Sequence, residues 1–128
     1  MALAQEAALK LKETCQIHAE AFSSAEFKHG PQSLVEKDFS IIVFANRGPA
    51  LQELLSFASQ MKARGAQVIL VGPADVDETD VAFAQAHHSD LDILCGIQSF
   101  YLMVDQLARS RGLHPDHPRN LTKVTKTT

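Results

Sequence analysis

Residues 40–71 read SIIVFANRGPALQELLSFASQMKARGAQVILV, and this stretch decides the fold. Two short and almost wholly apolar runs, 40–45 and 68–71, enclose an amphipathic segment with Pro49 in its first turn and Gly65 past its end. Strands without polar alternation are typical of parallel sheets that are covered on both faces, and a helix is the usual connection between two such strands. The stretch therefore predicts a strand, a helix and a strand of an α/β fold.

The segment before this unit is predicted to be helical. Over residues 3–18, apolar side chains recur at spacings of three and four, as on one face of a helix (Ala4, Ala8, Leu11, Cys15). A shorter helix is expected over 19–26, ended by the turn His29-Gly30-Pro31. No strand precedes the first helix, although an open α/β sheet normally begins with one. We expect an α/β doubly wound parallel sheet that is flanked by helices and is missing its first strand.

Two further elements are predicted after the unit. Residues 81–84 form a third, weak strand, and residues 90–111 form a long helix. That helix carries two apolar stripes, which predicts burial between the sheet and a second domain or subunit (Leu94, Ile97, Tyr101, Val104, Ala108; and Leu91, Cys95, Leu102). The final segment, 113–128, has no periodicity and is expected to be an ordered loop or a tail.

Composition excludes several classes of protein. The 128 residues are 45% hydrophobic with a net charge of −3, which is typical of a soluble globular domain and lacks the basic excess of a nucleic-acid binder. No apolar run approaches the roughly 20 residues that span a bilayer. The N-terminus has no signal-peptide pattern, so a cytoplasmic location is expected. Cys15 and Cys95 form no CxxC motif and are expected to be buried reduced thiols.

Taken one at a time, the candidate site residues have ordinary interpretations. Lys10 and Glu13 lie one helical turn apart, as in many surface ion pairs. Asn46 and Arg47 follow the first strand at its carboxyl end, where open α/β sheets bind ligands, but no phosphate-binding glycine motif accompanies them. On composition alone, Lys123 is a tail lysine.

The histidines do not predict a metal site. His87 and His88 are adjacent and would point in different directions, whereas His114 and His117 lie in a segment that contains two prolines. We therefore expect no metal.

Two long motifs in this chain resemble a known family. The stretch EAALKLKETCQIHAEAFSSAEFKHGP and the ending RGLHPDHPRNLTKVTKT closely resemble the second sugar isomerase (SIS) domain of the glucosamine-6-phosphate synthase and deaminase family. The resemblance runs from Leu3 to the C-terminus and implies an SIS-type doubly wound α/β fold. It implies that residues 1–128 are a partial SIS domain, the second and C-terminal one of a two-SIS protein, and that 113–128 are its active-site tail.

The resemblance also implies roles for individual residues. Glu13 matches the glutamate that moves a proton between sugar carbons C1 and C2, and Lys10 matches a lysine beside it. His29 matches the histidine that opens the sugar ring and reaches the active site of the neighbouring subunit, which implies a homodimer. Lys123 matches the lysine that forms a Schiff base with an open-chain ketose phosphate. Substrate binding is expected at three further positions (Thr122, Asn46, Arg47).

The residue types suit this chemistry. Removing a proton from a sugar carbon needs a carboxylate shielded from water, where its pKa can rise. Histidine exchanges protons near neutral pH, as ring opening requires, and a lysine that is deprotonated often enough can attack a carbonyl.

The implied function is the interconversion of fructose 6-phosphate and glucosamine 6-phosphate, without a metal or an organic cofactor. The Ser/Thr-rich phosphate loop of the family belongs to the first SIS domain, so we expect this C-terminal half to be inactive without that domain. The ending resembles the isomerising glucosamine-6-phosphate deaminases. Two alternatives stay open: the isomerase domain of a glutamine–fructose-6-phosphate aminotransferase, and a non-catalytic module that binds sugar phosphates.

Overall fold

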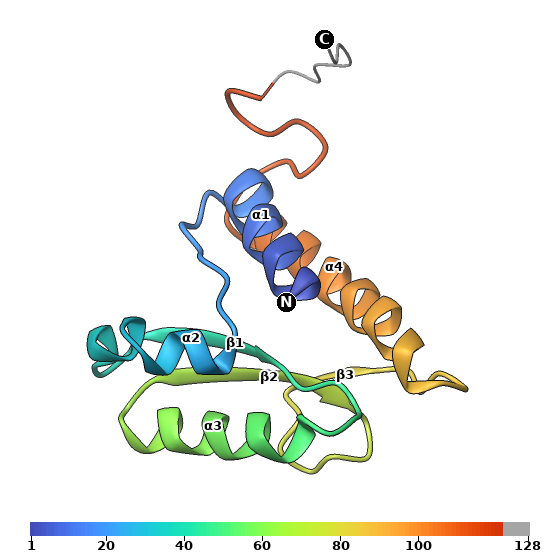
Figure 1. Cartoon of the computed structure of the whole chain (residues 1–128). Coiled ribbons are helices and arrows are strands. Elements are labelled where there is room, and N and C mark those ends of the chain that lie inside the picture. The colour runs from blue at the N-terminus through green and yellow to red at the C-terminus, as the bar shows by residue number, and fades with distance from the viewer. Residues whose placement is uncertain (122–128) are drawn as a thin grey trace, which may run out of the picture.

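The structure is a computed structural model that describes residues 1–121. Three strands form a parallel sheet in the order β1-β2-β3, with helices on both of its faces (Figure 1). In chain order, the elements are α1 (Ala2–Cys15), α2 (Ser24–Lys28), the 3-10 helix η1 (Pro31–Leu34), β1 (Ser40–Phe44), α3 (Leu51–Ala63), β2 (Gln67–Pro73), β3 (Val81–Phe83), η2 (Ser89–Leu91) and α4 (Asp92–Ser110).

The sheet separates two apolar clusters because successive side chains of a strand point to opposite faces. On one face, Val43 packs with α3 and with Phe27 of α2. On the other face, Ile42 and Phe44 pack against α1 and α4 around Phe100. Figure 1 shows the same division, with α1 and α4 lying side by side on one face and α3 covering the other.

The central strand, helix and strand are confirmed. β1 pairs with β2 in parallel, with Val43 beside Leu70. The predicted third strand is also confirmed as the short β3. Gly65 follows the end of α3 with a φ of 94°, a backbone conformation that glycine adopts without the steric cost of a Cβ. Pro49, however, lies before α3, which begins at Leu51 rather than at the proline.

The predicted N-terminal helices are too long. α1 ends at Cys15 because Gln16 takes a left-handed conformation (φ 54°), and the Ile17 amide donates back to the Leu11 carbonyl at 3.0 Å. The helix expected over 19–26 is wrong for most of its length. Residues 16–22 are not helical, and α2 begins only after Ser23, whose side chain caps its first turn.

The buried face of α4 is also displaced from the predicted stripes. Its most buried positions recur every four residues (Gly96, Phe100, Val104, Ala108). Val104 and Ala108 of the first predicted stripe are buried as expected. Its Leu94 and Tyr101 are 63% and 37% exposed, and Leu91 and Leu102 of the second stripe are exposed as well. Gly96 lies where α4 meets α1, and a Cβ there would lie 3.4 Å from the end of the Leu3 side chain.

The prediction that both cysteines are buried reduced thiols is confirmed only in part. Both cysteines are free, but only Cys15 is buried, and Cys95 is half-buried. Within residues 1–121, no helix is both long and apolar enough to cross a membrane. Burial of α4 against a second domain or subunit stays a prediction.

Candidate functional site

The predicted Lys10–Glu13 pair is present on α1. Lys10 Nζ donates to Glu13 Oε2 at 2.7 Å, and each side chain is about 30% exposed. The hydrogen bond with Glu13 is the main cause of a pKa of Lys10 above its ordinary value, and it outweighs the partial burial that acts in the opposite direction. The Lys10 ammonium is therefore a hydrogen-bond donor directly beside Glu13, whose side chain is 31% exposed and so is not shielded from water by the described residues.

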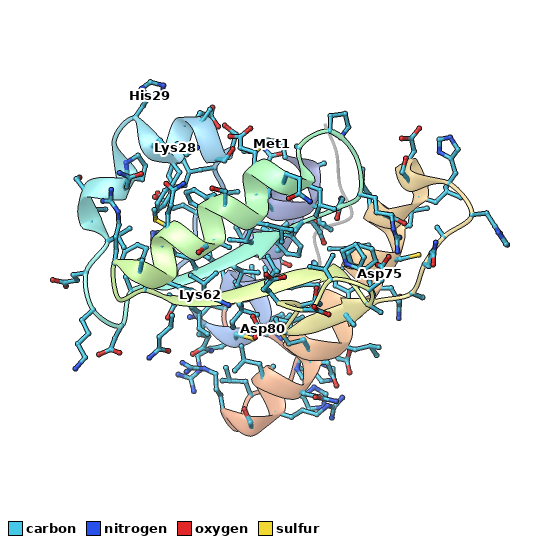
Figure 2. All side chains as sticks on the ribbon, turned by 90° about the horizontal axis from the view of Figure 1, so that it is seen from below. Met1, Lys28, His29, Lys62, Asp75 and Asp80 are labelled. Atoms are coloured by element: carbon cyan, nitrogen blue, oxygen red, sulfur yellow. The ribbon has the colours of Figure 1, made fainter. Side chains whose placement is uncertain are left out.

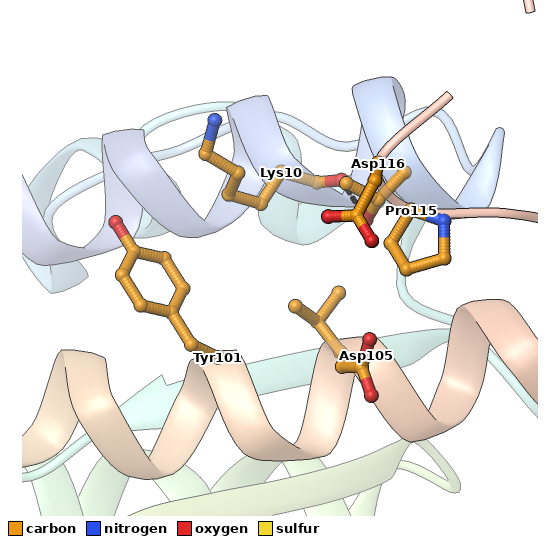
Figure 3. A pocket seen from close by; sticks show the side chains of 7 residues that line it. Lys10, Tyr101, Asp105, Pro115 and Asp116 are labelled. Carbon is orange, nitrogen blue, oxygen red and sulfur yellow. Dashed lines mark hydrogen bonds between the residues drawn. The ribbon is translucent and has the colours of Figure 1, made fainter. Parts of the chain in front are cut away.

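Lys10 of this pair lines an open pocket of about 410 Å³ between α1 and α4 (Figure 3). The pocket is lined by Lys10, Thr14, Tyr101, Val104, Asp105, Pro115 and Asp116. Tyr101 on α4 points toward α1, where Lys10 lies. The pocket thus joins the first motif to the segment that precedes PRNLTK, although Thr122 and Lys123 themselves lie outside the described residues.

Tyr101 was missed as a site residue. The sequence pattern placed it on a buried stripe, whereas its hydroxyl reaches the pocket side of α4 and donates to Glu6 Oε1 at 2.8 Å. Its phenol was the available signal, because a tyrosine hydroxyl among apolar helix residues usually needs a polar partner.

His29 lies on a turn that is built by local hydrogen bonds. Ser23 Oγ accepts from the Glu26 amide at 3.2 Å, and Glu26 Oε2 accepts from the Ser23 amide at 2.9 Å, which makes a capping box at the start of α2. The chain then turns through Gly30 and Pro31 into η1. Lys28 donates to Glu53 of α3 at 3.5 Å, so the helix before His29 is also tied to its neighbour.

The structure does not bring His29 and Glu13 together. α2 is anchored by Phe27 in the cluster on the α3 face, whereas α1 packs in the cluster on the opposite face of the sheet. His29 is exposed, and Figure 2 shows it at the rim of the molecule, pointing away from the ribbon. The described residues thus keep His29 and Glu13 on elements of opposite faces of the sheet.

Arg47 lies at the carboxyl end of β1 and is held by carboxylates of this chain. Its Nη1 atom lies 3.2 and 3.1 Å from the two carboxylate oxygens of Asp92, and Nη2 donates to Asp75 at 3.0 Å. Asp92 is completely buried in the first turn of α4. The guanidinium thus joins the end of β1, the loop after β2 and the start of α4, and a substrate phosphate would compete with two carboxylates for it.

Asn46, the neighbour of Arg47, is placed differently. Its Oδ1 atom is buried and accepts no hydrogen bond from the part of the chain that the structure describes. A buried carbonyl oxygen usually accepts a hydrogen bond, but this oxygen is not exposed and Asn46 does not line the pocket between α1 and α4.

Metal-binding side chains do not gather anywhere among residues 1–121 in groups of three or more. The rings of His114 and His117 lie with their centroids 4.8 Å apart, next to the pocket residues Pro115 and Asp116.

Comparison with known proteins identifies the family to which this chain belongs. The family model described as "SIS domain" matches residues 1–109, and the chain belongs to this family. It is an SIS domain that resembles the C-terminal isomerase domain of glutamine–fructose-6-phosphate aminotransferases and their relatives.

Three relatives illustrate the similarity. The glutamine–fructose-6-phosphate aminotransferase (isomerizing) of Aeropyrum pernix is 41% identical over 129 residues, which cover 95% of this chain and 21% of the relative. The solved C-terminal domain of glucosamine-fructose-6-phosphate aminotransferase from Francisella tularensis has 33% identity and a TM-score of 0.75, over 88% of this chain and 33% of that one. Glucosamine-6-phosphate deaminase from Thermotoga maritima has 28% identity and a TM-score of 0.71, over 94% and 35%.

The chain therefore spans about a fifth of the curated relatives that it matches and about a third of the solved chains. It is homologous to isomerase domains of a sugar-phosphate isomerase family.

Proposed function

We propose that this chain is the C-terminal SIS half of an amino-sugar-phosphate isomerase or deaminase, and that it interconverts fructose 6-phosphate and glucosamine 6-phosphate when it is completed by a first SIS half. The observation that carries the proposal is the 2.7 Å hydrogen bond from Lys10, which lines the pocket, to Glu13. Glu13 is the base that moves a proton between C1 and C2, and Lys10 is the cation beside it. Such proton transfer by a positioned side chain contributes roughly 10²–10⁴-fold to a rate.

Lys123 is the nucleophile of this proposal. The segment that leads to it lines the pocket with Pro115 and Asp116, so a short continuation of the chain has the sugar site within reach. Thr122 is proposed to bind substrate beside it, and Asn46 and Arg47 to do so at the end of β1. Of these, Asn46 offers an unoccupied acceptor, whereas Arg47 must first give up a carboxylate.

A missing first strand is also part of the proposal. β1 is an edge strand in the order β1-β2-β3, so its outer backbone groups have no strand partner among the described residues. Exposed edges of this kind pair readily with another strand. A preceding strand added beside β1 would complete a doubly wound sheet, with residues 113–128 as its active-site tail.

We further propose that the active form is a homodimer. His29 and Glu13 lie on elements that pack on opposite faces of the sheet, which supports a site that takes the two residues from different chains. The exposed turn at His29 fits a role in the site of a neighbouring subunit.

The isomerase domain of a glutamine–fructose-6-phosphate aminotransferase is a second candidate. The 41% identity to the Aeropyrum pernix aminotransferase favours it. Both candidates use the same isomerase site, and they differ in the source of nitrogen: free ammonia for a deaminase, glutamine for an aminotransferase.

The test uses the completed protein, meaning this chain joined to the segment that precedes the matched region in the Aeropyrum pernix relative. Fructose 6-phosphate with borohydride should leave a reduced sugar-phosphate adduct on Lys123, seen by mass spectrometry of peptides. Lys123→Arg should keep the charge but lose the adduct and the turnover, because a guanidinium is not a usable nucleophile. The control is Lys37→Arg, an exposed lysine outside the site.

Full activity in Lys123→Arg would refute the nucleophile role. A completed protein that is folded by circular dichroism and binds glucosamine 6-phosphate without converting it would instead favour the non-catalytic sugar-phosphate-binding module. Substantial turnover by the present chain alone would refute the need for a first SIS half.

A further inference from the structure

Tyr101 joins two helices at the pocket, and none of the roles described above uses it. It is the only tyrosine of the chain and lies on α4. Its Oη donates to Glu6 Oε1 on α1 at 2.8 Å, a contact between residues 95 positions apart. Tyr101 also lines the pocket together with Lys10, so the contact lies beside the Lys10–Glu13 pair rather than at a distant point of the helix interface.

Glu6 belongs to the same face of α1 as that pair. Residues four and three apart on a helix are neighbours, so Glu6, Lys10 and Glu13 follow one another along this face. Lys10 Nζ lies 3.8 Å from Glu6 Oε1, the oxygen that accepts from Tyr101, and 2.7 Å from Glu13 Oε2. The ammonium therefore lies between two carboxylates and is hydrogen-bonded to Glu13.

The tyrosine hydroxyl influences which of these two carboxylates the Lys10 ammonium binds. A carboxylate oxygen that already accepts a hydrogen bond from a hydroxyl has less capacity left for an ammonium. The hydrogen bond also fixes the rotamer of Glu6, which is otherwise a flexible and partly exposed side chain. The bond to Glu6 raises the pKa of the Tyr101 hydroxyl above its ordinary value, so it stays a donor throughout the neutral range.

We infer that Tyr101 is a positioning residue: it holds Glu6 and thereby keeps the Lys10 ammonium on Glu13 at the rim of the pocket. The inference rests on the proposed function for the roles of Lys10 and Glu13. Without the hydroxyl, Glu6 is free to draw Lys10 away, and the proton donor beside the base is no longer fixed.

The contact itself is tested on the present chain, without any activity. Because the chain has one tyrosine and no tryptophan, the ultraviolet absorbance of tyrosinate reports Tyr101 alone. Glu6→Gln should lower the pKa of Tyr101 toward the ordinary value of about 10, because the carboxylate that disfavours tyrosinate is gone. Lys10→Gln should raise it, since the nearby cation lowers it. Glu36→Gln, at an exposed glutamate outside this face, is the matched control and should change nothing.

The positioning role is tested in the completed protein. Tyr101→Phe should lower kcat about tenfold and leave KM within about twofold, because the substrate contacts are kept while the proton transfer is impaired. The double variant Glu6→Gln/Tyr101→Phe should be no slower than the slower single variant, since both act through one contact. Gln106→Ala, at an exposed position further along α4 and outside both predicted stripes, should keep the activity.

The two proposals fail in different ways. If the completed wild-type protein neither turns over sugar phosphate nor gives the Lys123 adduct, the proposed function fails, and the titration still judges the contact. If the wild type is active but Tyr101→Phe keeps its kcat, or if Glu6→Gln leaves the tyrosine titration unchanged, the positioning role is overturned.

Discussion

The two sides of the sheet hold their candidate residues in different ways. On the α1–α4 side, Lys10 and Glu13 are fixed by side chains, and Tyr101 links this pair to a second helix through Glu6. On the α2–α3 side, His29 is placed by the backbone of a capped helix and a turn, while its own side chain is exposed. This difference fits the proposed roles, since a proton-transfer pair would need fixed distances between its own atoms, whereas a residue that serves another subunit would need only a rigid support and a free side chain.

The largest expected effect comes from substituting the candidate residue on each side of the sheet in turn. In the completed protein, Glu13→Gln should lower turnover by about 10²-fold or more, because the base is lost. His29→Ala should be strongly impaired as well, through loss of ring opening. Mixed dimers of these two variants should recover part of the activity, since one of the two shared sites then has both residues intact.

The control is a dimer in which both subunits carry the same substitution, either Glu13→Gln or His29→Ala. Such dimers should stay inactive. If verified mixed dimers of Glu13→Gln and His29→Ala also stay inactive, the shared site is wrong, and the two sides do not cooperate across an interface.

A second prediction distinguishes a structural role of Arg47 from a role in substrate binding. Arg47→Ala leaves the buried Asp92 carboxylate without its cation, and breaking a buried pair costs about 3 kcal/mol of unfolding free energy. Urea denaturation of the present chain measures this. Asp75→Asn is the matched control and should cost less than about 1 kcal/mol, because Asp75 is 71% exposed.

Adding Asp92→Asn to Arg47→Ala should restore part of the stability, since the unpaired charge is removed. If Arg47→Ala costs no more than Asp75→Asn, the guanidinium is not a structural clamp. It would then be available to a substrate phosphate, as the sequence predicts.

The fold was predictable where the hydrophobic pattern is local. SIIVFA and VILV specify buried parallel strands on their own, and the helix between them follows from its periodicity and from Gly65. The failures have longer-range causes. The left-handed Gln16 that ends α1 carries no glycine signal, and the buried face of α4 includes Gly96 and Phe100, which the predicted stripes left out.

The candidate site shows the same difference between local and long-range signals. Lys10 and Glu13 could be paired from helical spacing, and the SIS resemblance pointed to their role. The partner of Tyr101 and the two partners of Arg47 could not be predicted, because these contacts join positions 95, 45 and 28 residues apart. Such contacts depend on how whole elements pack, which the spacing within one helix does not report.

The smallest expected effect concerns the turn that supports His29. The hydrogen bonds from Ser23, from its backbone amide above all, lower the pKa of Glu26 below its ordinary value. A lowered carboxyl pKa means that the capping box contributes stability above about pH 4.3 and loses it as the pH falls through the lower pKa of the folded state. Carbon NMR of the Glu26 carboxyl measures this pKa directly. Ser23→Ala should raise it only in part, because the alanine amide still donates. An ordinary pKa for Glu26 in the wild type would mean that this cap is open in solution, and His29 would then lack the rigid support that sets this side of the sheet apart.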